Sequence, residues 1–63
     1  MLTDMAGRNI EKDVYVDYRH HFCQVLNVTD QIVLFKDLRD ICHTCTAISC
    51  AEAHENMFVL PSP

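Results

Sequence analysis

The clearest pattern along the chain is an alternation of apolar and polar residues that begins after position 12. Residues 14–18 read Val-Tyr-Val-Asp-Tyr, with an apolar or aromatic side chain at every second position. Successive side chains of a β-strand point to opposite faces of its sheet, so this period of two predicts a half-buried strand. Tyr15 falls on the face opposite Val14 and Val16, and we expect it to face solvent or a partner.

Two further segments, 22–28 and 31–36, have the same character. The first alternates between two faces and places Phe22, Leu26 and Val28 together on one of them. The second is dense in β-branched and aromatic residues, which favour strands. A Thr-Asp pair between the segments offers turn chemistry, although no glycine supports it. The two segments are therefore predicted to form an antiparallel hairpin.

The region from residue 37 to residue 56 allows two interpretations. Ser49 and Glu52 have the spacing of a capping box, which favours one short helix near residues 47–57. The alternation over 46–51 equally allows a fourth strand. We prefer the strand, because a short helix needs an apolar stripe and this segment offers little of one.

The segment 57–60 predicts a last short strand, which Pro61 ends because proline cannot donate to a ladder. The first residues are only weakly periodic. We therefore expect an N-terminal arm or short edge element over 1–12 and a single small β domain over 13–63. Five short strands separated by turns predict a mostly β fold, a small five-stranded antiparallel barrel.

Four apolar segments carry a family resemblance: residues 14–16, 23–26, 32–35 and 58–61. Their succession resembles that of small SH3-like β-barrel proteins, many of which are accessory proteins of phages and bacteria. The resemblance implies an SH3-like barrel that binds proteins or nucleic acid. It provides no motif whose functional residues could be transferred to this chain.

The length and net charge of the chain make two classes of function less favoured. A chain of 63 residues leaves little material for both a rigid scaffold and a shaped pocket, so we expect no enzyme. The net charge is −4, and the five Lys and Arg residues are spread along the chain. Binding to duplex nucleic acid draws on clustered Lys and Arg, so this balance makes nucleic acid the less favoured partner.

The sequence also suggests a location. Residues 1–7 have no basic region followed by an apolar stretch, as a secretory leader would, and the longest apolar run, 32–35, is too short to span a bilayer. We expect a cytoplasmic protein without membrane contact, whose four cysteines are thiols or metal ligands rather than disulfides.

Cysteine and histidine residues allow one structural zinc site. Cys42 and Cys45 form a C-x-x-C pair, a spacing that lets two thiolates reach one tetrahedral ion. The other ligands would come from an upstream H-x-x-C pair or from a downstream pair on one helical face. These alternative pairs are His20 with Cys23, and Cys50 with His54. The competing interpretation has more weight: the thiols are free and pack as small hydrophobic groups, so that the protein holds no cofactor.

These observations predict a small non-catalytic binding module that acts by protein–protein interaction, as a regulator, inhibitor or adaptor. In a phage setting, the expected target is a host factor. The candidate interface residues are Tyr15, Asp17 and Arg19. An exposed edge strand would also allow a homodimer, which would help a thin core.

The alternative hypothesis is a zinc-stabilised module that binds RNA or single-stranded DNA. Its contacts would come from Tyr18, Arg19, His20 and Lys36, which combine a ring with cationic side chains. It predicts stoichiometric zinc and binding that weakens as salt rises.

Overall fold

The computed structural model describes residues 1–61, and the predicted mostly β class is confirmed. Its strands and helix follow one another in the order β1 (Tyr15–Tyr18), β2 (His21–Val28), β3 (Ile32–Asp37), β4 (Cys45–Ser49), α1 (Cys50–Asn56) and β5 (Met57–Val59). The predicted hairpin is formed by β2 and β3, and the predicted last strand is β5.

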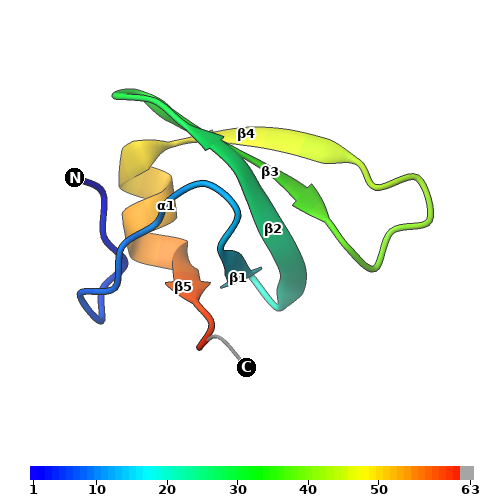
Figure 1. Ribbon diagram of the computed structural model, residues 1–63, viewed down its shortest axis with the longest axis horizontal. Coiled ribbons are helices and arrows are strands. Elements are labelled where there is room, and N and C mark those ends of the chain that lie inside the picture. The colour runs from blue at the N-terminus through cyan, green and yellow to red at the C-terminus, as the bar shows by residue number, and fades with distance from the viewer. Residues whose placement is uncertain (62–63) are drawn as a thin grey trace.

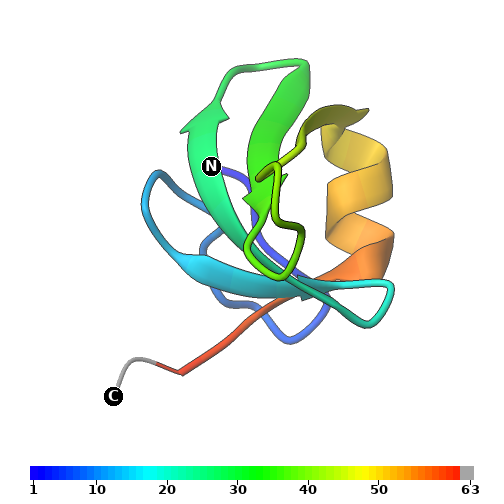
Figure 2. The ribbon, with the colours of Figure 1, turned by 90° about the vertical axis from the view of Figure 1, so that its right-hand side faces the viewer.

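All strands belong to one antiparallel sheet with the order β4-β3-β2-β1-β5. The first four strands form a meander, and β5 returns to pair with β1 (Figure 1). Within residues 1–61 no pairing joins β4 to β5, so hydrogen bonds do not close the sheet into a barrel. Figure 2 shows the helix standing beside the meander, where it contacts β3, β4 and β5.

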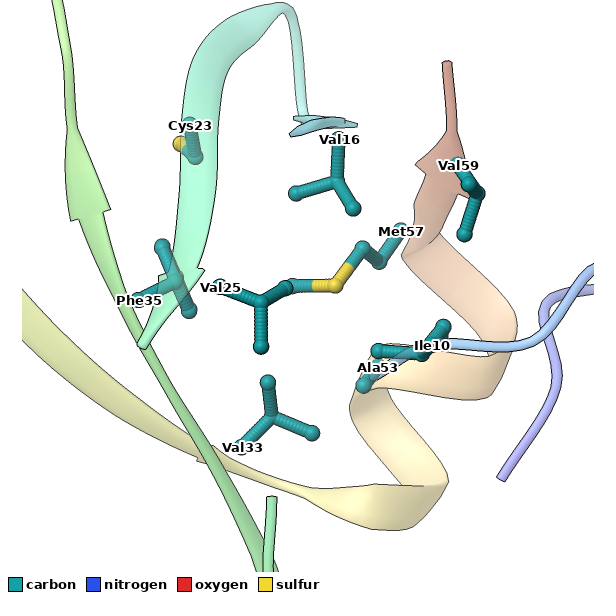
Figure 3. Close-up of a cluster of buried hydrophobic side chains, with 9 residues drawn as sticks. All are labelled: Ile10, Val16, Cys23, Val25, Val33, Phe35, Ala53, Met57 and Val59. Atoms are coloured by element: carbon teal, nitrogen blue, oxygen red, sulfur yellow. The ribbon is translucent and has the colours of Figure 1, made fainter. Parts of the chain in front are cut away.

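The hydrophobic core lies on one face of the sheet, between the strands and α1. Period-two alternation brings these side chains together, because each strand turns every second residue inward. The buried hydrophobic residues are Ile10, Val16, Cys23, Val25, Val33, Phe35, Ala53, Met57 and Val59 (Figure 3). Met57 follows the helix directly and reaches toward Val25, which joins the helical layer to the middle of the sheet.

A β-bulge corrects one prediction about β2. The register shifts between Val25 and Asn27, so that Val25 pairs with Phe35 and Asn27 with Leu34. The extra residue in the bulge reverses the alternation beyond it. Val28 therefore packs against the core instead of sharing the outer face of the sheet, and its predicted face was wrong.

Both interpretations of the segment around Ser49 apply, one after the other. The strand β4 ends at Ser49, and the helix begins at the next residue. The Ser49 hydroxyl accepts a hydrogen bond of 3.1 Å from the Glu52 N–H, which is the N-cap contact predicted by the spacing. The preferred strand interpretation is thus wrong beyond Ser49, because it gave too little weight to the cap. No helix in residues 1–61 is long and apolar enough to cross a bilayer.

Residues 1–12 pack against the edge of β5. Asp4 is 1% exposed, and its carboxylate accepts hydrogen bonds of 2.9 Å from the backbone N–H groups of Ala6, Arg8 and Val59. The Arg8 guanidinium donates to the Val59 carbonyl at 3.0 Å. The Asp4 carboxylate thus binds the backbone N–H of Val59, and the Arg8 guanidinium binds its C=O.

The ladder explains why Val59 needs these partners. The Leu60 N–H donates to the Tyr15 carbonyl at 2.9 Å, so Leu60 faces β1 in this part of the ladder. Alternate residues of an antiparallel strand turn their peptide groups to opposite sides. The N–H and C=O of Val59 therefore point away from β1, and Asp4 and Arg8 satisfy them in place of another strand.

The Asp4 contacts predict a loss of stability on substitution. Burial raises the pKa of Asp4. The hydrogen bonds from the backbone of Val59, Arg8 and Ala6 together lower the pKa by more than burial raises it, so the pKa of Asp4 lies below its ordinary value. We expect Asp4→Asn to reduce the free energy of unfolding at pH 7 by about 1–3 kcal/mol, because an amide cannot accept all three bonds. Urea unfolding measures the difference.

The pH dependence follows from the same contacts. A carboxylate whose pKa is depressed by folding stabilises the protein above its unfolded pKa, about 3.9, and this stabilisation disappears as the pH falls through the folded value. The gap between wild type and Asp4→Asn should therefore narrow below about pH 4. The exposed Asp30 provides the control, as Asp30→Asn should leave stability unchanged. Equal stability of wild type and Asp4→Asn would contradict the edge contacts.

Candidate functional site

The outer face of the sheet carries an exposed row of side chains across β5, β1 and β2. Asp17 pairs with Phe58 on one side and with Phe22 on the other, so the three residues lie side by side. Phe58 is 45% exposed and Phe22 is 37% exposed. Two phenylalanine rings thus flank a carboxylate on a face that the core does not use.

Tyr15 extends this row. Its ring stacks on that of Phe22, with a centroid distance of 5.6 Å and an interplanar angle of 15°. Tyr15 is 43% exposed, so the stack remains open to solvent on one side. We call the four residues Tyr15, Asp17, Phe22 and Phe58 the aromatic surface. Aromatic rings grouped on an exposed face are typical of interaction sites.

Two open hollows adjoin the aromatic surface, and both are lined by Asp17 and His20. One has a volume of about 330 Å³ and the other about 220 Å³. The larger hollow is also lined by Arg19, Asn56 and Phe58, and the smaller by Phe22, Arg39 and Leu60. The rings are thus bordered by cationic and amide groups that could orient a bound chain.

The turn between β1 and β2 is strained. Arg19 and His20 have φ angles of 51° and 70°, and the flanking Tyr18 and His21 are paired. A two-residue loop with both φ values positive is a type I′ hairpin turn, which strongly favours Asn-Gly over residues with bulky side chains. The His20 N–H donates to the Asp17 carboxylate at 2.9 Å, which helps to hold this conformation.

An ionic network fixes Arg19 at the rim of the surface. Glu52 Oε2 accepts from the Arg19 guanidinium at 2.8 Å and from the Tyr18 hydroxyl at 2.9 Å. The bond from Arg19, followed by that from Tyr18, lowers the pKa of Glu52. Burial, followed by the bond to Glu52, raises the pKa of Tyr18. The network joins the strained turn to α1.

The predicted interface residues lie together. Tyr15 and Asp17 belong to the aromatic surface, and Arg19 stands beside them in the turn. Phe22 and Phe58 were not among the candidate interface residues predicted from the sequence. Their positions in the alternation of each strand could have indicated exposure, because Phe22 and Phe58 are next to buried residues in the sequence and therefore point to the opposite face.

Tyr18 lies on the inner side of the sheet. Its ring packs against Phe35 with a centroid distance of 5.1 Å and a tilt of 59°, and its hydroxyl binds Glu52. The ring in the hypothesis of nucleic-acid contacts through Tyr18, Arg19, His20 and Lys36 is therefore half-buried and lies on the face opposite Tyr15, Phe22 and Phe58. The outer-face rings belong to other residues.

The candidate metal ligands are dispersed. Cys23 pairs with Asp37, whereas Cys45 pairs with Lys36, the adjacent residue of β3. Neighbouring residues of a strand face opposite sides, so the Cys23 and Cys45 thiols lie on opposite faces of the sheet. Cys23 is buried, and burial followed by the negative charge of Asp37 raises its pKa to about 11. His20 lies apart from both, in the β1–β2 turn.

The downstream ligands are also separate. The Cys50 thiol donates to the Thr29 carbonyl at 3.4 Å, while His54 Nδ1 lies 2.6 Å from the Thr3 carbonyl oxygen. Cys42 is exposed in the loop before β4. Over residues 1–61, no three His, Cys, Asp or Glu side chains come together in a way that could hold a metal ion.

No family model matches the chain, and comparisons with curated proteins and with solved structures gave no match. The site is therefore interpreted from its own chemistry. Exposed rings, one carboxylate and cationic groups at the rim can provide apolar contact, hydrogen bonding and charge pairing.

Relief of the strained turn gives a direct test of its geometry. His20→Gly should raise the free energy of unfolding by about 1 kcal/mol, because glycine adopts positive φ without the Cβ clash. His21→Gly, one residue later in β2, should lower it by about the same amount, because glycine weakens a strand. Thermal and urea unfolding of both variants measure the opposite signs. A destabilised His20→Gly variant would contradict the positive φ at this position.

Proposed function

We propose that the protein is a small non-catalytic binding module that recognises another protein through the aromatic surface. The observation that carries this proposal is the solvent exposure of the Tyr15–Phe22 stack and of Phe58, beside Asp17 on one face. A partner that covers these rings would remove them from water, and this burial of apolar surface would favour binding.

The charges around the rings suggest what the partner looks like. The Asp17 Oδ1 accepts a hydrogen bond from the His20 N–H, and because Asp17 lines both hollows, its carboxylate can also accept from a cationic or amide group of a partner. Arg39 borders the smaller hollow and can pair with a carboxylate. A segment of protein with an apolar side chain between groups of both charges would match this arrangement.

The fold supports a function in recognition. We propose that the open sheet and its helix form a barrel-like body of the SH3-like type, a likeness supported by the four-strand meander with the last strand beside the first. Proteins of that type act through their surfaces. We therefore propose a role as a regulator, inhibitor or adaptor in the cytoplasm, with a host factor as the target if a phage encodes it.

Nucleic acid is the second candidate ligand, because exposed rings can also stack on single-stranded bases. Arg19, His20 and Arg39 around the hollows favour it. Two features favour protein: the net charge of −4, and the position of Asp17 in the middle of the rings, where it would repel phosphate. The zinc that this second candidate would include has no assembled ligand set in residues 1–61.

Affinity capture from the native cell, followed by calorimetry with the purified partner, tests the proposal. We expect Phe22→Ala and Phe58→Ala each to weaken binding at least about 10-fold, as for aromatic residues that dominate an interface. Met5→Ala is the matched control, because Met5 is 65% exposed but lies in the N-terminal turn. It should bind as wild type does.

Three results would contradict the proposal. One is a partner that all three variants retain equally while circular dichroism shows them folded. Another is captured material that nuclease treatment releases and whose binding weakens steeply with salt, since this would identify nucleic acid as the ligand. The third is a wild-type protein that retains no specific partner.

A further inference from the structure

The two edges of the sheet differ in whether their outward peptide groups are hydrogen-bonded within the chain. At the β5 edge, Asp4 and Arg8 bind the outward N–H and C=O of Val59, so a further strand finds these groups occupied. At the β4 edge no segment of residues 1–61 pairs with the strand beyond β3. An edge strand with free peptide groups is a template for another strand.

The ladder shows which β4 groups are free. The Asp37 N–H donates to the Thr44 carbonyl and the Cys50 N–H to the Gln31 carbonyl, so residues 44 and 50 face β3. The alternation between them turns residues 46 and 48 to β3 as well. The outward groups are therefore the N–H and C=O of Cys45 and Ala47 and the N–H of Ser49, because the C=O of Ser49, the N-cap of α1, accepts the first hydrogen bond of the helix.

This edge lacks the usual protection. Cys45–Ser49 contains no charged residue and no proline, and its pairing with β3 is regular, without a bulge. Natural edge strands are commonly protected by lysine, proline, bulges or a covering segment. The β5 edge has such a cover, whereas no segment of residues 1–61 pairs with the β4 edge.

We propose that β4 pairs antiparallel with β4 of a second copy of this chain, with the two-fold axis at Ala47. In this register Ala47 faces Ala47 of the other copy, and Cys45 faces Ser49. The two Ala47 residues exchange two hydrogen bonds, and in each Cys45–Ser49 pair the Ser49 N–H donates to the Cys45 C=O. Pairing continues the sheet of one copy into that of the other.

The chemistry of the strand fits a second copy. Although each chain carries a charge of −4, β4 is neutral, so symmetric pairing brings no like charges opposite each other within the strands. Between the hydrogen-bonded pairs, Thr46 faces Ile48, and pairs of β-branched residues are favourable neighbours in a sheet.

The pairing leaves the aromatic surface free. That surface lies on β5, β1 and β2, whereas β4 is at the other edge of the sheet. The dimer would therefore carry two copies of it and gain from bivalent binding. The proposal does not depend on the proposed function, since it concerns only the peptide groups of β4.

Sedimentation equilibrium from roughly 10 μM to 1 mM tests the proposal, because a single strand pair buries little area and should bind weakly. The wild type should pass from monomer to dimer in this range. Ala47→Pro removes the N–H at the two-fold axis but no bond to β3, and should weaken dimerisation at least about 10-fold. Ala47→Ser retains the N–H and should dimerise as wild type does.

A second variant and a second readout guard against misfolding. Ala47→Lys would place two like charges across the axis, and it replaces Ala47→Pro if that variant fails to fold. Amide hydrogen exchange at Ala47 should slow with protein concentration in the wild type. The proposal is overturned if the wild type remains monomeric to 1 mM, or if a folded Ala47→Pro or Ala47→Lys variant dimerises as strongly as the wild type.

Discussion

The burial of a single apolar face determines the rest of this structure. Val16, Val25 and Val33 turn inward from three neighbouring strands, and Met57 meets them from the end of the helix. A slip of one residue in any strand would exchange its buried and exposed sets, which a core this small could not tolerate. The register is thereby fixed, and with it the residues that face solvent.

The candidate site is a consequence of that register. With the inner face fixed, Asp17, Phe22 and Phe58 must stand together on the outer face, and Tyr15 stacks beside them. Stability alone would favour Asn-Gly over Arg19 and His20 in the type I′ turn. Departures from the locally best residue are expected where a surface serves recognition.

The strands β1, β2, β3 and β5 could be predicted from the sequence, because alternation is a local signal. The helix was only one of two interpretations, and the strand was preferred over it although the Ser-x-x-Glu cap that begins α1 is also a local signal. The bulge that turns Val28 inward could not be predicted, since its position depends on the pairing of β2 with β3. Neither could the burial of Asp4, whose partners include Val59 at the other end of the chain. In β1, period two predicted that Tyr15 lies on the face opposite Val16, as it does, but the sequence did not show that Phe22 and Phe58 lie beside Asp17, because that depends on the pairing of β1 with β2 and β5.

Hydroxyl-radical footprinting of the native protein tests the inward and outward assignment most directly, since oxidation of a ring reports its contact with water. The inward and outward assignment predicts rapid oxidation of Phe22 and Phe58, which are 37% and 45% exposed, and protection of Phe35, which is 4% exposed. In urea the three phenylalanines should react at similar rates. Protection of Phe22 and Phe58 with rapid oxidation of Phe35 in the native protein would contradict it.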